Sequence, residues 1–111
     1  MKLNLTQAFK GLDRVDMVVK DKGPLTLKTV LLDTLLGQVA GDEAPEASEY
    51  KKQRFELSVK LSKAEDEVEL TLDELNQIKK AIEGKQPGFL PLMHGQALAM
   101  IEDKPTGLET E

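Results

Sequence analysis

The chain has no cysteine and no tryptophan, and it has one histidine among 111 residues. The absence of cysteine excludes disulfides, thiolate metal sites and cysteine nucleophiles. Aromatic residues are scarce, with three Phe and one Tyr, which leaves little material for the aromatic wall of a ligand pocket. No apolar run approaches the roughly 20 residues of a membrane-spanning helix. The first residues also lack the layout of a signal peptide, so we expect a cytoplasmic protein with no membrane contact.

Basic residues are not concentrated anywhere in the chain. Lys and Arg number 15 against 20 Asp and Glu, which gives a net charge of -5, and both halves of the sequence are mildly acidic. A protein that binds duplex DNA usually gathers Lys and Arg on one face to neutralise phosphates. We therefore expect no nucleic-acid partner, and the acidic charge is also too sparse for a mimic of DNA.

The length and the 40% of hydrophobic residues suit one domain with one core. Residues 103–111 contain Pro105, Gly107 and a single leucine, too little apolar surface to order a segment. We expect a globular domain over residues 1–102 and a flexible tail over residues 103–111.

Two segments begin with the same Leu-Thr-Leu sequence, and each predicts the start of a helix. In the second, Thr71 can cap the helix while Glu74 reaches back to the cap's own N–H group. Apolar residues then recur at the 3, 4 spacing of one buried face until Gly84, where we expect a left-handed stop.

The first such helix is expected to begin at the cap Thr26 and to end at Gly37. Its apolar stripe is wide because Leu32 and Leu36 lie at the edge of the buried face. Both are most simply residues of the core. A stripe this broad also predicts contact with more than one neighbour, so Leu32 and Leu36 are our candidates for a protein interface.

Residues 46–63 fit two structures. Alternation from Phe55 to Leu61 is typical of a half-buried strand, whereas the Lys52, Glu56, Lys60 ladder and the lack of turn residues favour a helix. We expect the helix. The segment 41–48 before it is acidic and small and predicts a solvated loop.

The remaining elements are short, apart from one helix expected over residues 91–102, where Gly95 would allow close approach of another backbone. Residues 2–5 and 17–19 favour extended structure and are expected to join in one small sheet, with a turn at residues 22–24. Residues 68–70 predict a further extended piece. The expected fold class is α+β, mainly α, with about four helices and a small N-terminal β-hairpin-like element.

No group of residues predicts catalysis, a metal or a cofactor. His94 is the one histidine, and no nucleophile or carboxylate lies near it in sequence. The acidic clusters at residues 42–49 and 65–69 lack the spacing and central glycine of a calcium loop and are expected to be solvated charge. Residues 71–84 and 91–102 resemble a helix-turn-helix pair, but only Gln96 and His94 on the second helix could contact bases.

The order of these short motifs resembles a set of small, mostly uncharacterised proteins of tailed bacteriophages and prophages. The motifs are Met1 to Leu5, Leu12-Asp13, Leu25-Thr26-Leu27, Val68 to Thr71 and Gly95-Gln96-Ala97. Arg14 departs from the pattern, because a turn glycine is expected after Leu12-Asp13. The resemblance implies a phage setting and a non-catalytic product, and it brings no active site.

We therefore expect a non-enzymatic protein-binding factor of phage origin, of the assembly or chaperone-like kind, in the cytoplasm of a bacterial host. Its partner is expected to be a phage protein, a host protein or a second copy of itself. An inhibitor of a host protein is the alternative, and a DNA-binding regulator is a more remote one. No cofactor is expected.

Overall fold

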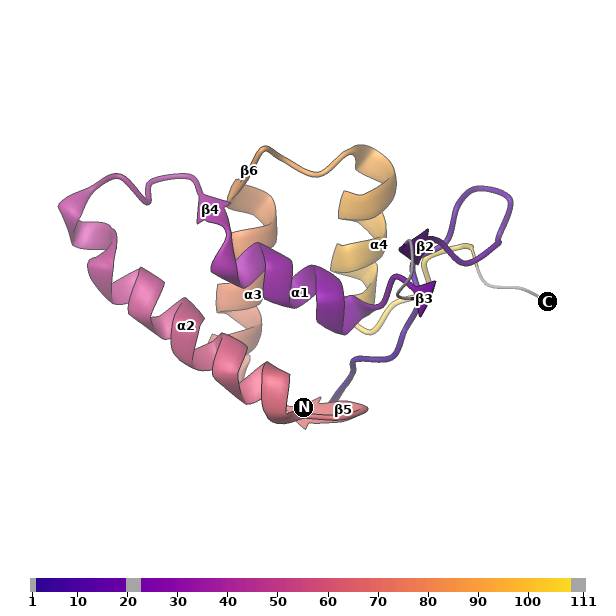
Figure 1. Cartoon of the computed structure of the whole chain (residues 1–111), viewed down its shortest axis with the longest axis horizontal. Helices are drawn as coiled ribbons and strands as arrows, with labels where there is room; N and C mark the ends of the chain where they lie inside the picture. The colour runs from indigo at the N-terminus through magenta and orange to yellow at the C-terminus, as the bar shows by residue number, and fades with distance from the viewer. Residues whose placement is uncertain (1, 20–22, 109–111) are drawn as a thin grey trace.

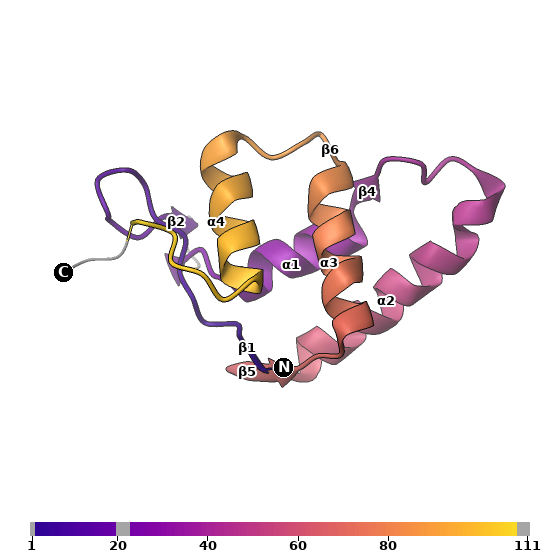
Figure 2. The same cartoon turned by 180° about the vertical axis from the view of Figure 1, so that it is seen from behind.

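The computed structural model describes residues 2–19 and 23–108, which form four α-helices and three short pairs of strands. The helices are α1 (Leu27–Leu36), α2 (Ser48–Lys63), α3 (Leu72–Gly84) and α4 (Pro91–Ile101), and a 3-10 helix (Pro45–Ala47) leads into α2. Helix α1 lies across α3 and α4, and α2 runs along α1 and diverges from α3 at its N-terminal end (Figure 1, Figure 2). The expected fold class, α+β and mainly α, is confirmed, and residues 46–63 are helical rather than a strand.

The strands pair differently from our expectation. β1 (Lys2–Asn4) pairs antiparallel with β5 (Glu67–Glu69), and β2 (Val18–Val19) pairs with β3 (Gly23–Pro24). The prediction of one sheet joining residues 2–5 to 17–19 is therefore wrong. Leu3 and Leu5 are buried with Val68 and Leu70, so the N-terminal strand gains its core contacts beside the connector between α2 and α3. β4 (Gln38–Val39) and β6 (Lys85–Gln86) form the third pair.

The predicted turn at residues 22–24 falls partly outside the described residues, as Lys22 is not among them. Gly23 has a φ of +84°, in the left-handed region that favours glycine. Arg14 also has a positive φ, of 64°.

One core joins all four helices. Leu31, Leu61, Ile78 and Ala97, one from each helix, are fully or almost fully buried in it, together with Phe9 of the N-terminal segment. The buried positions of α1 follow the predicted stripe, and Leu36 lies outside it.

The two Leu-Thr-Leu segments differ at their caps. The Thr71 hydroxyl accepts from the Glu74 N–H group at 3.1 Å, and the Glu74 carboxylate accepts from the Thr71 N–H group at 2.9 Å. Thr26 occupies the N-cap position of α1 but makes no side-chain cap hydrogen bond, and its hydroxyl lies 3.4 Å from that of Thr29. Thr26 thus occupies the predicted cap position without a cap hydrogen bond, and the reciprocal bond that Glu74 makes in α3 has no counterpart because position three of α1 is a threonine.

Gly84 is the last residue of α3, but it does not adopt the left-handed conformation that we predicted. A Cβ atom at this position would lie 2.9 Å from Cγ1 of Val39. The glycine therefore allows β4 to pass close to the end of α3. Gly95 does not serve such an approach, since no neighbouring atom lies within 4 Å of its Cβ position.

The start of the predicted tail is held by α4. The Lys104 N–H group donates to the Ala99 carbonyl at 2.8 Å, and residues 103–108 then continue without helix or strand. Residues 109–111, the end of the predicted tail, lie outside the described residues.

Candidate functional site

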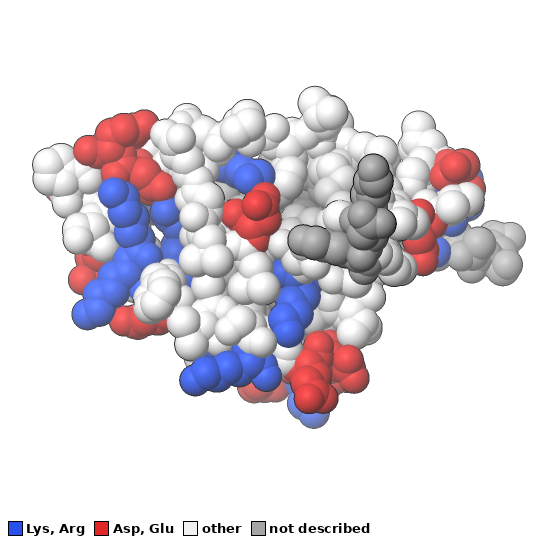
Figure 3. Space-filling view, viewed as in Figure 1, with Lys and Arg blue, Asp and Glu red and all other residues white. Residues whose placement is uncertain are grey.

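The first candidate surface is an apolar face formed by α1 and α2. Leu36 is 63% exposed and Phe55 is 60% exposed, whereas Leu32 is half-buried and packs against the core. Leu32 and Leu36 are four residues apart and therefore lie on one side of α1. Figure 3 views the side on which α1 lies in front, where uncharged surface, apolar and polar together, lies between groups of charged side chains. We call Leu32, Leu36 and Phe55 the apolar face.

Hydrogen bonds from side chains to main-chain carbonyls join α1 and α2, and each helix supplies a donor side chain. The Lys28 ammonium, near the start of α1, donates to the Ala64 carbonyl at 2.6 Å, just beyond the end of α2. At the other end, Arg54 Nε donates to the Leu35 carbonyl at 3.3 Å. Leu36 and Phe55 directly follow these two residues in sequence, so they lie at the same end of the helix pair. The exposed members of the apolar face thus come from two helices that are fixed together.

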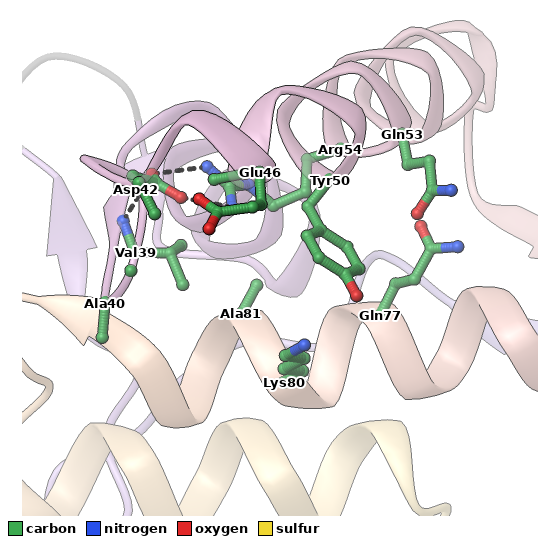
Figure 4. Close-up of a pocket in the computed structure, with 13 residues that line it drawn as sticks. Val39, Ala40, Asp42, Glu46, Tyr50, Gln53, Arg54, Gln77, Lys80 and Ala81 are labelled. Atoms are coloured by element: carbon green, nitrogen blue, oxygen red, sulfur yellow. Dashed lines mark hydrogen bonds and ion pairs between the residues drawn. The ribbon is translucent and has the colours of Figure 1, made fainter.

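A pocket of about 310 Å³ lies on the other side of α2, between α2, α3 and the segment from β4 to the 3-10 helix (Figure 4). Its floor is apolar and includes Val39, Ala47 and Ala81, which are buried. This volume is at the lower end of the range of small-ligand sites.

An ion pair closes one end of this pocket. Arg54 donates to both Asp42 carboxylate oxygens, at 2.9 and 2.7 Å, and the Val39 N–H group donates to Asp42 at 2.9 Å. The hydrogen bonds from Arg54 lower the pKa of Asp42 below its usual value, although partial burial opposes the shift. Our prediction that Asp42 is solvated charge is wrong, because its side chain is only 15% exposed. The paired carboxylate holds the segment after β4 against α2.

The opposite end of the pocket carries polar groups that have no such partner. The ammonium of Lys80 lies 4.5 Å from the centre of the Tyr50 ring, in cation–π geometry. Beside them, the amide groups of Gln53 on α2 and Gln77 on α3 point toward one another (Figure 4). Neither amide is hydrogen-bonded to another residue in the described part of the chain. Two amides and a lysine therefore border an apolar cavity with their polar atoms accessible.

The other residues singled out from the sequence do not come together into a reactive site. His94 lies half-buried on α4, and the acidic residues 65–67 and 69 are exposed. Over residues 2–19 and 23–108, no three His, Asp or Glu side chains are placed to hold a metal ion.

Gln96 is unavailable for contacts with bases. It is 4% exposed, its carbonyl oxygen accepts from the Lys10 N–H group at 2.8 Å, and its amide nitrogen donates to the Lys10 carbonyl at 2.8 Å. The same nitrogen donates to the Leu92 carbonyl at 3.1 Å. The side chain thus joins the N-terminal segment to α4, a role that no local pattern in the sequence predicts.

Sequence reasoning named Leu32 and Leu36 but missed Phe55 and the pocket. One sequence signal was available, because Tyr50 and Gln53 are three residues apart, as are Gln77 and Lys80, and such pairs share one side of a helix. That the two pairs face each other depends on how α2 packs against α3, which the spacing does not reveal.

Comparison of the chain with protein-family models, with curated proteins and with solved structures finds no match. In the described part of the chain, no helix has both the length and the apolar character needed to cross a membrane.

Proposed function

We propose that this chain is a non-enzymatic protein-binding factor that contacts its partner through the apolar face. The observation that carries the proposal is the exposure of Leu36 and Phe55 on two helices that side-chain hydrogen bonds hold together. Large apolar side chains at the surface of a rigid helix pair are typical anchors of protein interfaces. Leu32, one turn before Leu36 on α1, is half-buried and packs against the core.

The partner belongs to one of two classes. The resemblance to phage proteins favours an assembly or chaperone-like role in the cytoplasm of a bacterial host, with a virion protein or a second copy as partner. The alternative is inhibition of a host protein. Recognition of DNA is less favoured, because α4 has no Lys, Arg or Asn and its Gln96 is already bonded to Lys10.

The test compares the wild-type chain with Leu36→Ser/Phe55→Ser and with a matched control, Leu12→Ser/Leu90→Ser. The control removes two leucines that are even more exposed but lie outside α1 and α2. Each protein is measured by light scattering after size exclusion over a tenfold range of concentration, and is then used for affinity capture from host and infected-cell lysates.

We expect the first double variant to lose self-association or the captured protein, and the control to keep it. A concentration-dependent oligomer or a captured virion protein supports the assembly role, and a captured host protein supports inhibition. Equal losses in both double variants, or no loss in either, would refute the apolar face as the interface.

A further inference from the structure

The pocket between α2 and α3 has the features of a site for a short peptide segment. Its floor is lined by Val39, Ala47 and Ala81, so a side chain that enters it must be apolar to gain from burial. A volume of about 310 Å³ leaves room for one anchor side chain and its neighbouring peptide groups. The floor thus selects an aliphatic side chain.

The border of the pocket carries hydrogen-bonding groups that can pair with the ligand's main chain beside its aliphatic side chain. A peptide group carries one N–H donor and one carbonyl acceptor, and each primary amide offers the complementary pair. Gln53 and Gln77 face one another from α2 and α3 and have no hydrogen-bond partner in the described residues. Their oxygens face each other and their NH2 groups point away (Figure 4), so both NH2 groups can donate to the main-chain carbonyls of a ligand, which a purely apolar ligand does not offer.

The positive charge of Lys80, beside the amides, favours an acidic residue next to the aliphatic one in the ligand. Lys80 makes no ion pair in the described part of the chain, and its ammonium is held over the Tyr50 ring. Arg54, at the other end of the pocket, is already paired with Asp42. Glu46, which also lines the pocket, lies at that same end (Figure 4). The cation available to a ligand is therefore Lys80, next to the amides.

We propose that this pocket binds a short segment of a partner protein in which an aliphatic side chain is followed by a carboxylate. The aliphatic side chain occupies the floor, the main chain accepts hydrogen bonds from the amides of Gln53 and Gln77, and the carboxylate pairs with Lys80. The inference rests on the proposed protein-binding function and names the chemistry of the partner. The proposed peptide site and the apolar face are different surfaces, since Gln53 and Phe55 are two residues apart and so lie roughly 200° apart around α2.

The experiment titrates the full ¹⁵N-labelled chain with short capped peptides, followed by ¹H–¹⁵N NMR. The probes are acetyl-Leu-Glu-amide, acetyl-Leu-Gln-amide, acetyl-Ala-Glu-amide and 3-methylbutan-1-ol, which carries the aliphatic group without a peptide. The variants are Lys80→Gln and Gln53→Ala/Gln77→Ala, which change exposed or half-buried side chains and leave the core intact. Leu36→Ser/Phe55→Ser is the control for the apolar face.

We expect saturable shifts of the Val39, Ala47 and Ala81 amides with acetyl-Leu-Glu-amide, at high micromolar to millimolar Kd. Replacing Leu by Ala should weaken binding about tenfold, because the aliphatic group is lost from the pocket. Replacing Glu by Gln should weaken it about two- to fivefold, and this preference should vanish in Lys80→Gln. Gln53→Ala/Gln77→Ala should weaken both leucine peptides alike, and Leu36→Ser/Phe55→Ser should bind them as the wild type does.

Each of three results would overturn the proposal. The absence of saturable shifts at the pocket means that no peptide of this class is bound. Equal binding of 3-methylbutan-1-ol and acetyl-Leu-Glu-amide means that the cavity takes apolar molecules without regard to peptide groups. Shifts at the pocket that grow with protein concentration alone identify a second copy of the chain as the occupant. The proposed function survives all three if capture still depends on Leu36 and Phe55.

Discussion

Replacement of Gln96 by leucine tests how the N-terminal segment is held on the helices. Gln96 is buried on α4, and its amide makes two hydrogen bonds to the main chain of Lys10, 86 residues earlier in sequence. Leucine has a similar size but neither a donor nor an acceptor. Gln96→Leu therefore removes both of these bonds and leaves the N–H and carbonyl groups of Lys10 without this partner.

The expected loss follows from the two bonds. A buried hydrogen bond contributes about 0.5–1.5 kcal/mol net, and an unpaired buried group costs about 1–3 kcal/mol. Lys10 is only half-buried, so water can reach part of its main chain. We expect the free energy of unfolding to fall by about 2 kcal/mol, which lowers Tm by roughly 8 °C for a domain of this size.

Urea denaturation followed by circular dichroism measures this loss, and hydrogen exchange of the Lys10 amide locates it. The matched control is Gln53→Leu, since that amide has no hydrogen-bond partner in the described residues and should change stability by less than about 0.5 kcal/mol. Equal stabilities of the two variants, or a Lys10 amide that stays protected in Gln96→Leu, would refute the role given to Gln96.

Three further predictions concern helix ends, glycines and pH. Thr71→Ala should cost about 1 kcal/mol, because it removes a capping box, whereas Thr26→Ala should cost less than half as much, and thermal denaturation of both measures the difference. Gly95→Ala should raise the free energy of unfolding by up to about 1 kcal/mol, since the new methyl group meets open space within a helix. Gly84→Ala should lower it by about 1–2 kcal/mol, because the new methyl group clashes with β4. Equal effects of the two substitutions in urea denaturation would contradict the close approach of β4 to Gly84. Hydrogen bonds from the arginine of α2 lower the pKa of Asp42 in the folded state, so the stability that it contributes is complete above its unfolded pKa, about 4, and is lost as the pH falls through the lower folded pKa. The stability difference between the wild type and Asp42→Asn should therefore shrink between pH 6 and pH 3, and a difference independent of pH would count against the ion pair.

The helices were predictable because their signals are local. Thr71 and Glu74 lie one helical turn apart, so the sequence itself contains the whole capping box. The wide stripe of α1 likewise led to Leu36, which the structure leaves exposed. In each case the residues that determine the structure are within a few positions of one another.

What escaped prediction depends on residues that are far apart in the chain. Asp42 reads as part of an acidic loop until Arg54, on the next helix, is placed beside it. Gln96 gives no sign in sequence of its bond to Lys10. Strands of two or three residues carry too little pattern to specify a partner, which is why the pairing of β1 with β5 was missed. The pocket combines all these difficulties, since its lining comes from α2, α3 and the segment before α2.

The pairing of β1 with β5 has a consequence for the order in which the chain can fold during synthesis. Leu3 lies opposite Val68, so the first strand has no partner until the residues after α2 have left the ribosome. Helices α1 and α2 can form and pack before then, because their contacts need only residues already made. Strand β1 must wait as an unpaired edge, although it is synthesised before both helices. In a nascent chain, β1 thus gains its strand partner only when the connector between α2 and α3 has been synthesised.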